Sequence, residues 1–375
     1  MPSILDNLHL LVSKRHGFPV YLIHMLTNRC NANCAHCFVD RTKPRPELDV
    51  EQIRVMAGQL GRNLMLVALG GGEPFLREDL VQVVHAYFTE TQVRIAQITT
   101  NGLLVDKILS DAEQIVRHFP EKSLVINCSI DGIGSRHDEI RGVPHLFDKV
   151  TLLYRQLRDL ADQYPNLTPS VNVTFSKLNQ DHVLDLLEYL IHTLRVENIA
   201  MTLARGRSMV PEATDVDLSC YESVISTLEL YLKRQVFIGY HGMLTGCLIN
   251  AQNIIARKRI LRTARRNVRQ GPCHAGRLAA VIQSDGEVYP CELLDESLGN
   301  VCRESFNAIW RGSAAQNVRN MTRLCYCTHE CFMLVSIIYS LRYTPALLGL
   351  AARMALRRTT RRAIEWFGRS KGENG

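Results

Sequence analysis

Apolar and polar positions alternate in two different patterns between residue 20 and about residue 203. Six short runs rich in apolar and β-branched residues occur at 20–26, 65–70, 93–100, 123–130, 170–175 and 197–203. Between them lie stretches with apolar residues at helical spacing, for example 51–60, 78–88, 106–119 and 181–194. Strands that alternate with helices in this way predict a parallel sheet with right-handed crossovers, in an α/β fold.

The rest of the chain divides into parts of different character. Residues 216–268 have mainly helical spacing, and a predicted hairpin turns at Asp285-Gly286 within a cysteine-rich stretch. Beyond it the chain is apolar and then rich in arginine. We therefore expect an N-terminal segment at 1–19, an α/β core at 20–215, a helical linker at 216–268, a small cysteine-rich domain at 269–335 and an apolar, basic tail at 336–375.

Basic residues are concentrated in two segments. The formal net charge is +7, yet residues 254–269 carry seven basic and no acidic residues, and residues 352–375 carry seven basic and two acidic ones. The remainder therefore carries −5, which argues against a uniformly basic nucleic-acid-binding protein, and we expect no nucleic-acid partner. The first residues lack the features of a secretory signal, so we expect a cytoplasmic protein.

The C-terminal tail has two interpretations. Residues 332–356 are strongly apolar and long enough in principle to span a bilayer, but Arg342, Pro345 and Arg353 interrupt them. One interpretation is a basic amphipathic helix in peripheral contact with the inner face of the membrane, with Trp366 and Phe367 near the interface. The other is a set of ordinary amphipathic helices packed on the core. Residues 254–269 have the same two interpretations.

Three cysteines lie close together directly after the first predicted strand. Cys30, Cys34 and Cys37 have the spacing C-x3-C-x2-C. Clustered cysteines in a chain of this kind are more often metal ligands than disulfides. Three thiols with no fourth beside them leave an open coordination position, as in a [4Fe–4S] cluster that has one iron free to bind something else. The alternative is a zinc site completed by His36 or by a distant residue.

Glycines and polar residues follow each of the other predicted strands. They are Gly71, Gly72 and Glu73 after the second, Asn101 and Gly102 after the third, Ser129 and Asp131 with Arg141 after the fourth, Asn172 on the fifth, and Leu203 and Arg205 on the sixth. In folds of this class the C-terminal ends of the strands meet on one side of the sheet. We therefore expect these residues to form one site beside the cysteine loop.

Together these motifs resemble the radical S-adenosylmethionine (radical SAM) enzymes, over roughly residues 20–335. The resemblance implies a partial (β/α)6 barrel of the TIM type. It implies an oxidoreductase in which Cys30, Cys34 and Cys37 hold a [4Fe–4S] cluster that binds S-adenosylmethionine (SAM). In this family the reduced cluster cleaves SAM to a 5′-deoxyadenosyl radical, which abstracts hydrogen from a substrate. An electron donor such as flavodoxin or ferredoxin is implied as a partner.

The resemblance also implies roles for the residues at the strand ends. The backbone at Gly71, Gly72 and Glu73 would receive the methionyl amino group of SAM, and Ser129 and Arg141 would hold the carboxylate and its surroundings. His36 and Leu203 would line the adenosyl part. Asp131 and Asn172 would accept hydrogen bonds from the ribose hydroxyls. A turn role for Asp131 and a backbone-satisfying role for Asn172 remain as alternatives.

The later cysteines resemble the C-terminal extension called SPASM, or its shorter form, twitch. Cys273 is followed after twelve residues by a G-x4-C pair, Gly286 and Cys291. The full pattern continues as C-x2-C-x5-C-x3-C with a further cysteine, whereas this chain has only Cys325, Cys327 and Cys331.

We therefore expect one auxiliary [4Fe–4S] cluster. Its expected ligands are Cys273, Cys291 and Cys331, with Cys325 or Cys327 as the fourth. A structural zinc is the alternative, since four thiolates also satisfy Zn²⁺. Glu292 stands where some peptide-modifying relatives place an acidic base, so we interpret it as a candidate catalytic residue. An ordinary surface carboxylate is the alternative for Glu292.

The substrate is not identified by any motif. Relatives with this extension often modify ribosomal peptides, and others act on small molecules. The composition of the tail favours a membrane-associated, lipid-linked or other small substrate. Few residues precede the first strand to form a peptide-binding domain, which disfavours a peptide substrate. A peptide maturase is the alternative. A hypothesis of another class is a metal-stabilised binding or electron-transfer protein without SAM chemistry, in which the strand-end motifs would serve no purpose.

Overall fold

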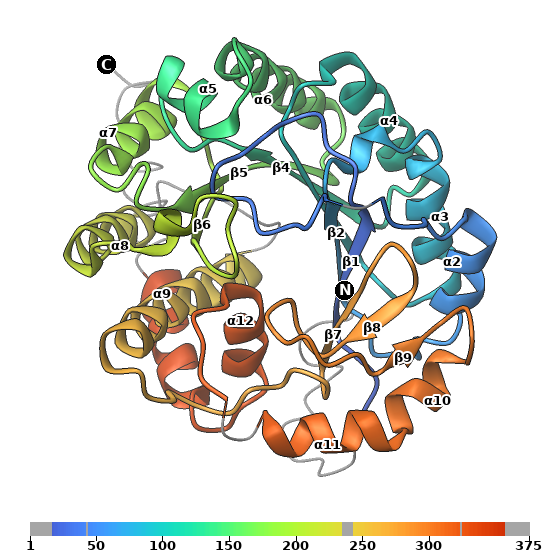
Figure 1. The fold of residues 1–375 in the computed structure, drawn as a ribbon. Helices are drawn as coiled ribbons and strands as arrows, with labels where there is room; N and C mark the ends of the chain where they lie inside the picture. Colours follow the sequence, from blue (N-terminus) through green and yellow to red (C-terminus); the bar gives the residue numbers. More distant parts are fainter. Residues whose placement is uncertain (1–16, 43, 235–242, 323–324, 357–375) are drawn as a thin grey trace, which may run out of the picture.

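Strands and helices alternate through most of the computed structural model, which describes residues 17–42, 44–234, 243–322 and 325–356 (Figure 1). The strands are β1 (Tyr21–Thr27), β2 (Leu66–Gly71), β3 (Ile95–Thr100), β4 (Ser123–Ser129), β5 (Leu167–Phe175), β6 (Ile199–Leu203), β7 (Ala279–Ile282), β8 (Glu287–Tyr289) and β9 (Gly299–Asn300). The helices are α2 (Val50–Ala57), α3 (Leu80–Glu90), α4 (Val105–His118), α5 (Ser135–Arg141), α6 (Leu146–Gln163), α7 (Val183–Glu188), α8 (Leu218–Arg234), α9 (Met243–Arg266), α10 (Phe306–Arg311), α11 (Ser313–Met321) and α12 (Glu330–Ile338). Shorter turns are η2 (Pro74–Leu76), η3 (Tyr189–Thr193) and η4 (Pro211–Thr214).

The described strands form one curved sheet in the order β6-β5-β4-β3-β2-β1-β7-β8-β9. Strands β1 to β6 pair in parallel with their sequence neighbours, which confirms the predicted βα units. The curved sheet and the helices outside it form the predicted partial barrel (Figure 1). All six C-terminal strand ends lie on one side, because parallel strands connected by helices run in the same direction.

The cysteine-rich segment continues this sheet. Strand β7 pairs in parallel with β1, and β8 and β9 add antiparallel strands beyond it. The predicted hairpin at Asp285-Gly286 is the connection between β7 and β8. The N-terminal strand of the core and the later cysteine-rich segment are therefore hydrogen-bonded neighbours, which no local pattern in the sequence indicates.

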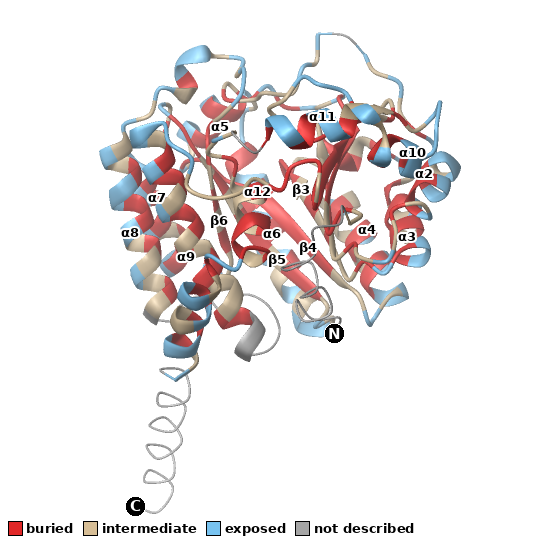
Figure 2. Ribbon diagram, turned by 90° about the horizontal axis from the view of Figure 1, so that it is seen from below, coloured by how far each residue is buried: buried red, intermediate tan, exposed pale blue. Residues whose placement is uncertain are grey.

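Strand β1 faces two hydrophobic clusters. Leu22 and Leu26 pack with the residues of the surrounding helices, whereas Ile23 and Met25 pack on the other face with β7 and α12. Figure 1 shows α12 inside the ring of helices, between α9 and β7, and Figure 2 shows that the residues around it are largely buried. Helix α12 thus packs on the inner face of the sheet, near the strands that begin and end the core.

Helix α9 carries the first basic segment and packs on the protein. Ile254 and Leu261 are buried, and Lys258 and Arg265 form ion pairs with Glu229 and Glu222 of α8. For this segment the packing interpretation therefore holds over the membrane interpretation. No helix in the described ranges has both the length and the apolar character needed to cross a membrane. Tyr343, Leu347 and Ala351 of the tail are buried in the core, so the described part of the tail also packs on the protein. Residues 357–375 lie outside the described ranges, and their expected membrane contact stays a prediction.

Candidate functional site

The loop that carries the first three cysteines begins directly after β1 and is held from two sides. On one side, Asn33 N of the loop donates over 2.9 Å to the carbonyl oxygen of Arg141, the last residue of α5. On the other side, Val210 N, in the segment after β6, donates to Ala35 O over 2.8 Å. Backbone hydrogen bonds to two distant segments thus fix the loop at the C-terminal ends of the strands.

The thiols of this loop have N–H donors beside them. Ala32 N lies 3.5 Å from Cys30 Sγ, and an Arg141 Nη lies 3.7 Å from Cys34 Sγ. All three thiols are free, and burial raises the pKa of Cys30 and Cys37. Within the described ranges, no three His, Cys, Asp or Glu side chains are gathered closely enough to hold a single metal ion. Thiols that receive N–H···S hydrogen bonds are the donor set of an iron–sulfur cluster.

The glycines after β2 bring that strand against the cysteine loop. Gly72 N donates to Thr27 O over 2.7 Å, and Glu73 N donates to Arg29 O over 2.8 Å. A Cβ on Gly72 would lie 1.9 Å from Arg29 O, and one on Gly71, whose φ is +118°, would lie 2.1 Å from Thr27 O. The sequence predicted a close approach of this backbone to a ligand. In the structure this backbone instead lies against the start of the cysteine loop, and the missing side chains of the two glycines make this close contact possible.

Glu73 connects the second strand end to the third. Its buried carboxylate accepts from Thr100 Oγ1 and from Asn101 N, each over 2.8 Å, and burial raises its pKa to about 7. The Asn101 side chain in turn donates to Asn31 Oδ1 over 2.7 Å, inside the cysteine loop. Sequence reasoning gave Asn101 no role beyond its place at a strand end. That place was the available signal for this contact.

A buried ion pair follows the fourth strand. An Arg141 Nη lies 2.5 Å from Asp131 Oδ2, and Asp131 Oδ1 accepts from Thr174 N over 2.7 Å. His36 Nε2 lies 3.6 Å from Asp131, and burial lowers the pKa of His36 to about 4, so this histidine is neutral at pH 7. Asp131 is fully buried, and its Oδ2, although paired with Arg141, has no hydrogen-bond partner in the described ranges. Its expected ribose contact therefore stays a prediction beside its observed contact with Arg141.

The other predicted residues lie close to these strand ends. Ser129, the last residue of β4, is buried. Asn172 on β5 accepts from the Thr202 hydroxyl over 3.0 Å, a side-chain contact, so its expected ribose and backbone roles both stay predictions. Leu203, the last residue of β6, is buried, and its N–H donates to Glu330 over 2.6 Å. The structure thus brings the predicted strand-end residues to one side of the sheet.

The later cysteines lie in one part of the structure. Cys327 affects the pKa of Cys273, Cys291 and Cys325, so these four thiols lie near one another. Leu293 N donates to Cys291 Sγ over 3.4 Å. Cys331 packs, like Cys273, against the apolar cluster that contains Cys291, and Arg205, Glu292 and Tyr21 also influence its pKa. The expected ligand set of Cys273, Cys291 and Cys331 with Cys325 or Cys327 therefore stays a prediction.

Glu292 is held by an ion pair with Arg205 and by a contact with His329, whose pKa burial lowers to about 4. One of its oxygens lies 3.0 Å from an Arg205 nitrogen and 2.7 Å from His329 Nε2. Burial alone would raise the pKa of Glu292, but His329 and Arg205 lower it to about 2. A carboxylate that holds its proton so weakly is a poor general base at neutral pH. The catalytic role of Glu292 stays a prediction, whereas its side chain, only 9% exposed, does not fit the alternative of an ordinary surface carboxylate.

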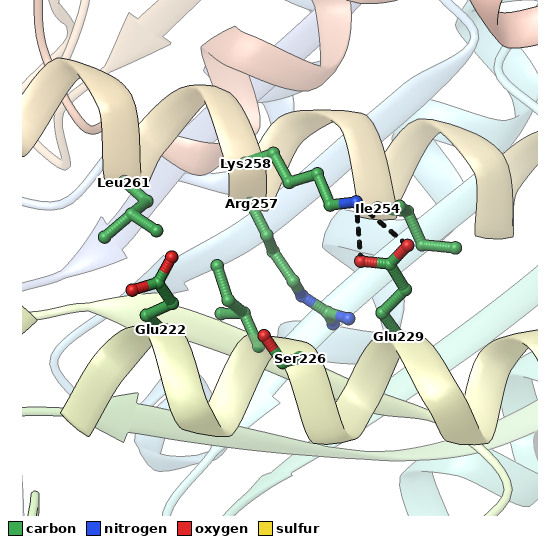
Figure 3. Close-up of a pocket in the computed structure, with 8 residues that line it drawn as sticks. Glu222, Ser226, Glu229, Ile254, Arg257, Lys258 and Leu261 are labelled. Atoms are coloured by element: carbon green, nitrogen blue, oxygen red, sulfur yellow. Dashed lines mark hydrogen bonds and ion pairs between the residues drawn. The ribbon is translucent and has the colours of Figure 1, made fainter. Parts of the chain in front are cut away.

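A cavity of about 60 Å³ lies between α8 and α9, away from the predicted residues (Figure 3). Arg257 points into the space between the helices, and Lys258 pairs with Glu229 at one end. Pockets for small molecules typically enclose about 300–1,000 Å³. This cavity is too small for SAM, so the strand ends beside the cysteine loop remain the candidate site.

Comparison with known protein families matches two parts of the chain. A model of the radical SAM superfamily matches residues 25–190, and a model of the iron–sulfur cluster-binding SPASM domain matches residues 273–332. The first match contains Cys30, Cys34 and Cys37, and the second contains Cys273, Cys291, Cys325, Cys327 and Cys331.

Curated relatives share about a quarter of their residues with this chain. The sporulation killing factor maturation protein SkfB of Bacillus subtilis is 27% identical over 87% of this chain and 73% of its own length. The mycofactocin maturase MftC of Mycobacterium tuberculosis is 27% identical over 79% of this chain and 71% of its own length. The AdoMet-dependent heme synthase of Methanosarcina barkeri is 24% identical over 77% of this chain and 81% of its own length.

Solved structures share the fold. The structure of anSMEcpe with bound AdoMet has a TM-score of 0.58 and 17% identity, and the match covers 89% of this chain and 95% of that one. SuiB of Streptococcus suis bound to S-adenosylmethionine has a TM-score of 0.58 and 16% identity, over 81% of this chain and 68% of that one. The matches extend across both the parallel strands and the cysteine-rich segment.

Proposed function

The chain belongs to the radical SAM superfamily and carries a SPASM domain, and on this basis we propose that Cys30, Cys34 and Cys37 hold the catalytic [4Fe–4S] cluster. One observation carries the proposal. Arg141 contacts the Cys34 thiol, yet its buried Nε has no hydrogen-bond partner within the described part of the chain. A buried unpartnered donor is costly, so a ligand that accepts from it is expected beside Cys34. The carboxylate of SAM is such an acceptor.

The residues around the loop have defined tasks in this proposal. When bound, the reduced cluster and SAM supply a 5′-deoxyadenosyl radical that abstracts hydrogen from the substrate. Asp131 pairs with one Nη of Arg141 and holds the guanidinium beside Cys34, where Nε is the donor proposed for the SAM carboxylate. The N–H groups of Gly72 and Glu73 donate to the cysteine loop. Since an ammonium group only donates, its proposed acceptors at this strand end are backbone carbonyl oxygens. His36 Nδ1 is another buried atom without a hydrogen-bond partner in the described ranges, and in this proposal His36 lines the adenosyl part.

The SPASM segment holds an auxiliary [4Fe–4S] cluster in this proposal. The four mutually close thiols, Cys273, Cys291, Cys325 and Cys327, are its ligands. Their number matches the four thiolates that such a cluster takes. Cys331 stays as a competing ligand, because it is only four residues from Cys327. Counting iron in single cysteine variants distinguishes the two ligand sets.

The first candidate substrate is a peptide. Support comes from relatives named as a maturation protein and a maturase that align with most of this chain. A small molecule is the second candidate, because a relative aligned over 81% of its length is named a heme synthase. The lipid-linked substrate expected from the tail depends on residues outside the described ranges.

Anaerobic reconstitution tests the cluster proposal. With two clusters, the wild type is expected to hold about eight irons per chain. With dithionite and SAM it should form 5′-deoxyadenosine. The C30A/C34A/C37A variant should lose about four irons and all SAM cleavage, whereas C302A, which changes an exposed cysteine, should keep both. Bound zinc without SAM cleavage would contradict the proposal and support a metal-stabilised binding or electron-transfer protein.

Single variants of the later cysteines test the auxiliary ligand set. C325A and C327A should each lose about four irons, and C331A should keep them. Loss of iron in C331A with retention in C325A would instead support the ligand set expected from the sequence.

A fractionation experiment tests the substrate class. Deproteinised extracts would be separated into peptide-sized, small-molecule and lipid fractions, and each would be added to the reconstituted enzyme. A peptide substrate predicts that one fraction stimulates 5′-deoxyadenosine formation and loses this effect after protease digestion. Stimulation that survives protease would favour the small-molecule candidate, and stimulation only by the lipid fraction would support the substrate expected from the tail.

A further inference from the structure

Arg205 is a buried cation between the core and the SPASM segment, which is the part of the chain at residues 273–332. It lies two residues after the end of β6, and its side chain is only 9% exposed. One Nη lies 2.5 Å from Glu330 Oε2, at the start of α12, and the other lies 3.0 Å from Glu292 Oε2, after β8. Two carboxylates from separate parts of the SPASM segment thus meet on one guanidinium of the core.

The partners of Arg205 share a position in the sequence. Glu292 directly follows Cys291, and Glu330 directly precedes Cys331. The third partner is the ring of Phe38, which lies 5.9 Å from the guanidinium carbon and directly follows Cys37 of the catalytic loop. The Arg205 side chain therefore contacts three residues that each stand next to a cysteine. Two of them lie in the SPASM segment and one lies in the catalytic loop.

Further contacts strengthen this arrangement on the SPASM side. The second oxygen of Glu330 accepts from Leu203 N over 2.6 Å, so Glu330 is attached to the end of β6 at two points. His329 Nε2 lies 2.7 Å from Glu292, which joins the two acidic segments to each other. A buried carboxylate deprived of its cation is destabilised strongly, because water cannot solvate it in place of the lost partner.

We propose that Arg205 is a positioning residue that fixes the auxiliary-cluster segment at a set distance and orientation from the catalytic cysteine loop. The inference rests on the proposed ligand roles of the cysteines. A substrate that reacts between the two clusters needs both at defined places, since a displacement of about 1 Å at a reacting centre can cost about 100-fold in rate. Arg205 meets this need because its planar fork holds two carboxylates in one geometry.

The chain offers a matched control in the same loop. Arg207 lies 3.8 Å from Asp295 and also joins the segment after β6 to the segment after Cys291. Its side chain is 97% exposed and that of Asp295 is 95% exposed. Exposed pairs of this kind contribute little, so R207M removes a charge from the same loop without disturbing the buried contacts.

The experiment compares R205M, R205K and R207M as anaerobically reconstituted holoproteins. Hydrogen exchange followed by mass spectrometry should show R205M exchanging about tenfold or more faster than wild type in peptides covering 290–296 and 328–333. R207M should match wild type. R205K should lie between them, because an ammonium keeps the charge but cannot hold both carboxylates as a fork.

A spectroscopic measurement separates positioning from general loosening. Two nearby reduced clusters enhance each other's electron-spin relaxation, and this effect falls steeply with distance. R205M should therefore shift the microwave power that half-saturates the catalytic-cluster signal, R205K should restore part of the shift, and R207M should leave the power at the wild-type value.

The outcomes distinguish the inference from the proposed function. Iron content and 5′-deoxyadenosine formation by the wild type test the proposed function. The contrast in hydrogen exchange between R205M and R207M compares variants prepared in the same way, so its outcome does not depend on SAM cleavage. Exchange in R205M equal to that in R207M would overturn the positioning role. If R205M does not fold, R205K decides: faster exchange in both peptides supports the role, and wild-type exchange and relaxation overturn it.

Discussion

Replacing Gly72 with alanine tests how the end of β2 holds the catalytic cysteine loop. A Cβ at this position would lie 1.9 Å from Arg29 O and 2.5 Å from Arg29 C, both of which are backbone atoms. Ordinary contact begins near 3.4 Å, so the strand and the loop would have to separate by about 1.5 Å. Arg29 directly precedes Cys30, and the displacement would therefore reach the first thiol.

The size of the effect follows from this displacement. Shifts of about 1 Å at a reacting centre can cost about 100-fold in rate, and overpacking in a tight place costs about 1–3 kcal/mol. We expect Gly72→Ala to form 5′-deoxyadenosine about 100-fold more slowly than wild type. It should also retain less iron at the catalytic cluster, because Cys30 no longer meets the geometry of the other two thiols.

The three consecutive glycines provide internal controls for this assay. A Cβ on Gly70 would meet no atom within 4 Å, so Gly70→Ala should stay within about twofold of wild type. Gly71→Ala combines a 2.1 Å contact with Thr27 O and a φ of +118°, and should lose at least as much as Gly72→Ala. A Gly72→Ala enzyme with wild-type iron content and rate would refute the inferred contact.

Three further predictions concern the residues that support the loop. Asp131→Ala should lower the free energy of unfolding by about 3–5 kcal/mol in urea, because it leaves Arg141 buried without its carboxylate. Asp131→Asn should cost less, and a loss under 1 kcal/mol for both would contradict the buried pair. For Glu73, burial raises the pKa from 4.5 to about 7, so the folded state binds the proton more tightly and stability is lost as pH rises from 4.5 to 7. Unfolding measured against pH should show a fall of about 3 kcal/mol relative to Glu73→Gln, and parallel curves would refute it. Asn101→Ala removes one hydrogen bond to Asn31, worth about 1 kcal/mol, and should release iron to a chelator about fivefold faster; an unchanged release rate would argue against this contact.

Local pattern in the sequence determined the elements and the place of the chemistry. Alternating strand and helix periods predicted β1 to β6, because side-chain burial follows a period of 2 on a strand and 3.6 on a helix. Parallel strands joined by helices all end on one side, so residues after different strands were expected to meet there. The C-x3-C-x2-C spacing likewise placed three thiols on one loop, since those residues are only seven positions apart from first to last.

Contacts between distant segments were decided only by the tertiary structure. The pairing of β7 with β1 and the ion pairs of Arg205 join residues that no spacing relates. The carboxylate of Glu292 shows the consequence. Beside Cys291 it resembled a candidate base, but the fold brings Arg205 and His329 onto it and lowers its pKa to about 2. A side chain's identity is local, whereas its charge state and freedom depend on neighbours that only packing brings together.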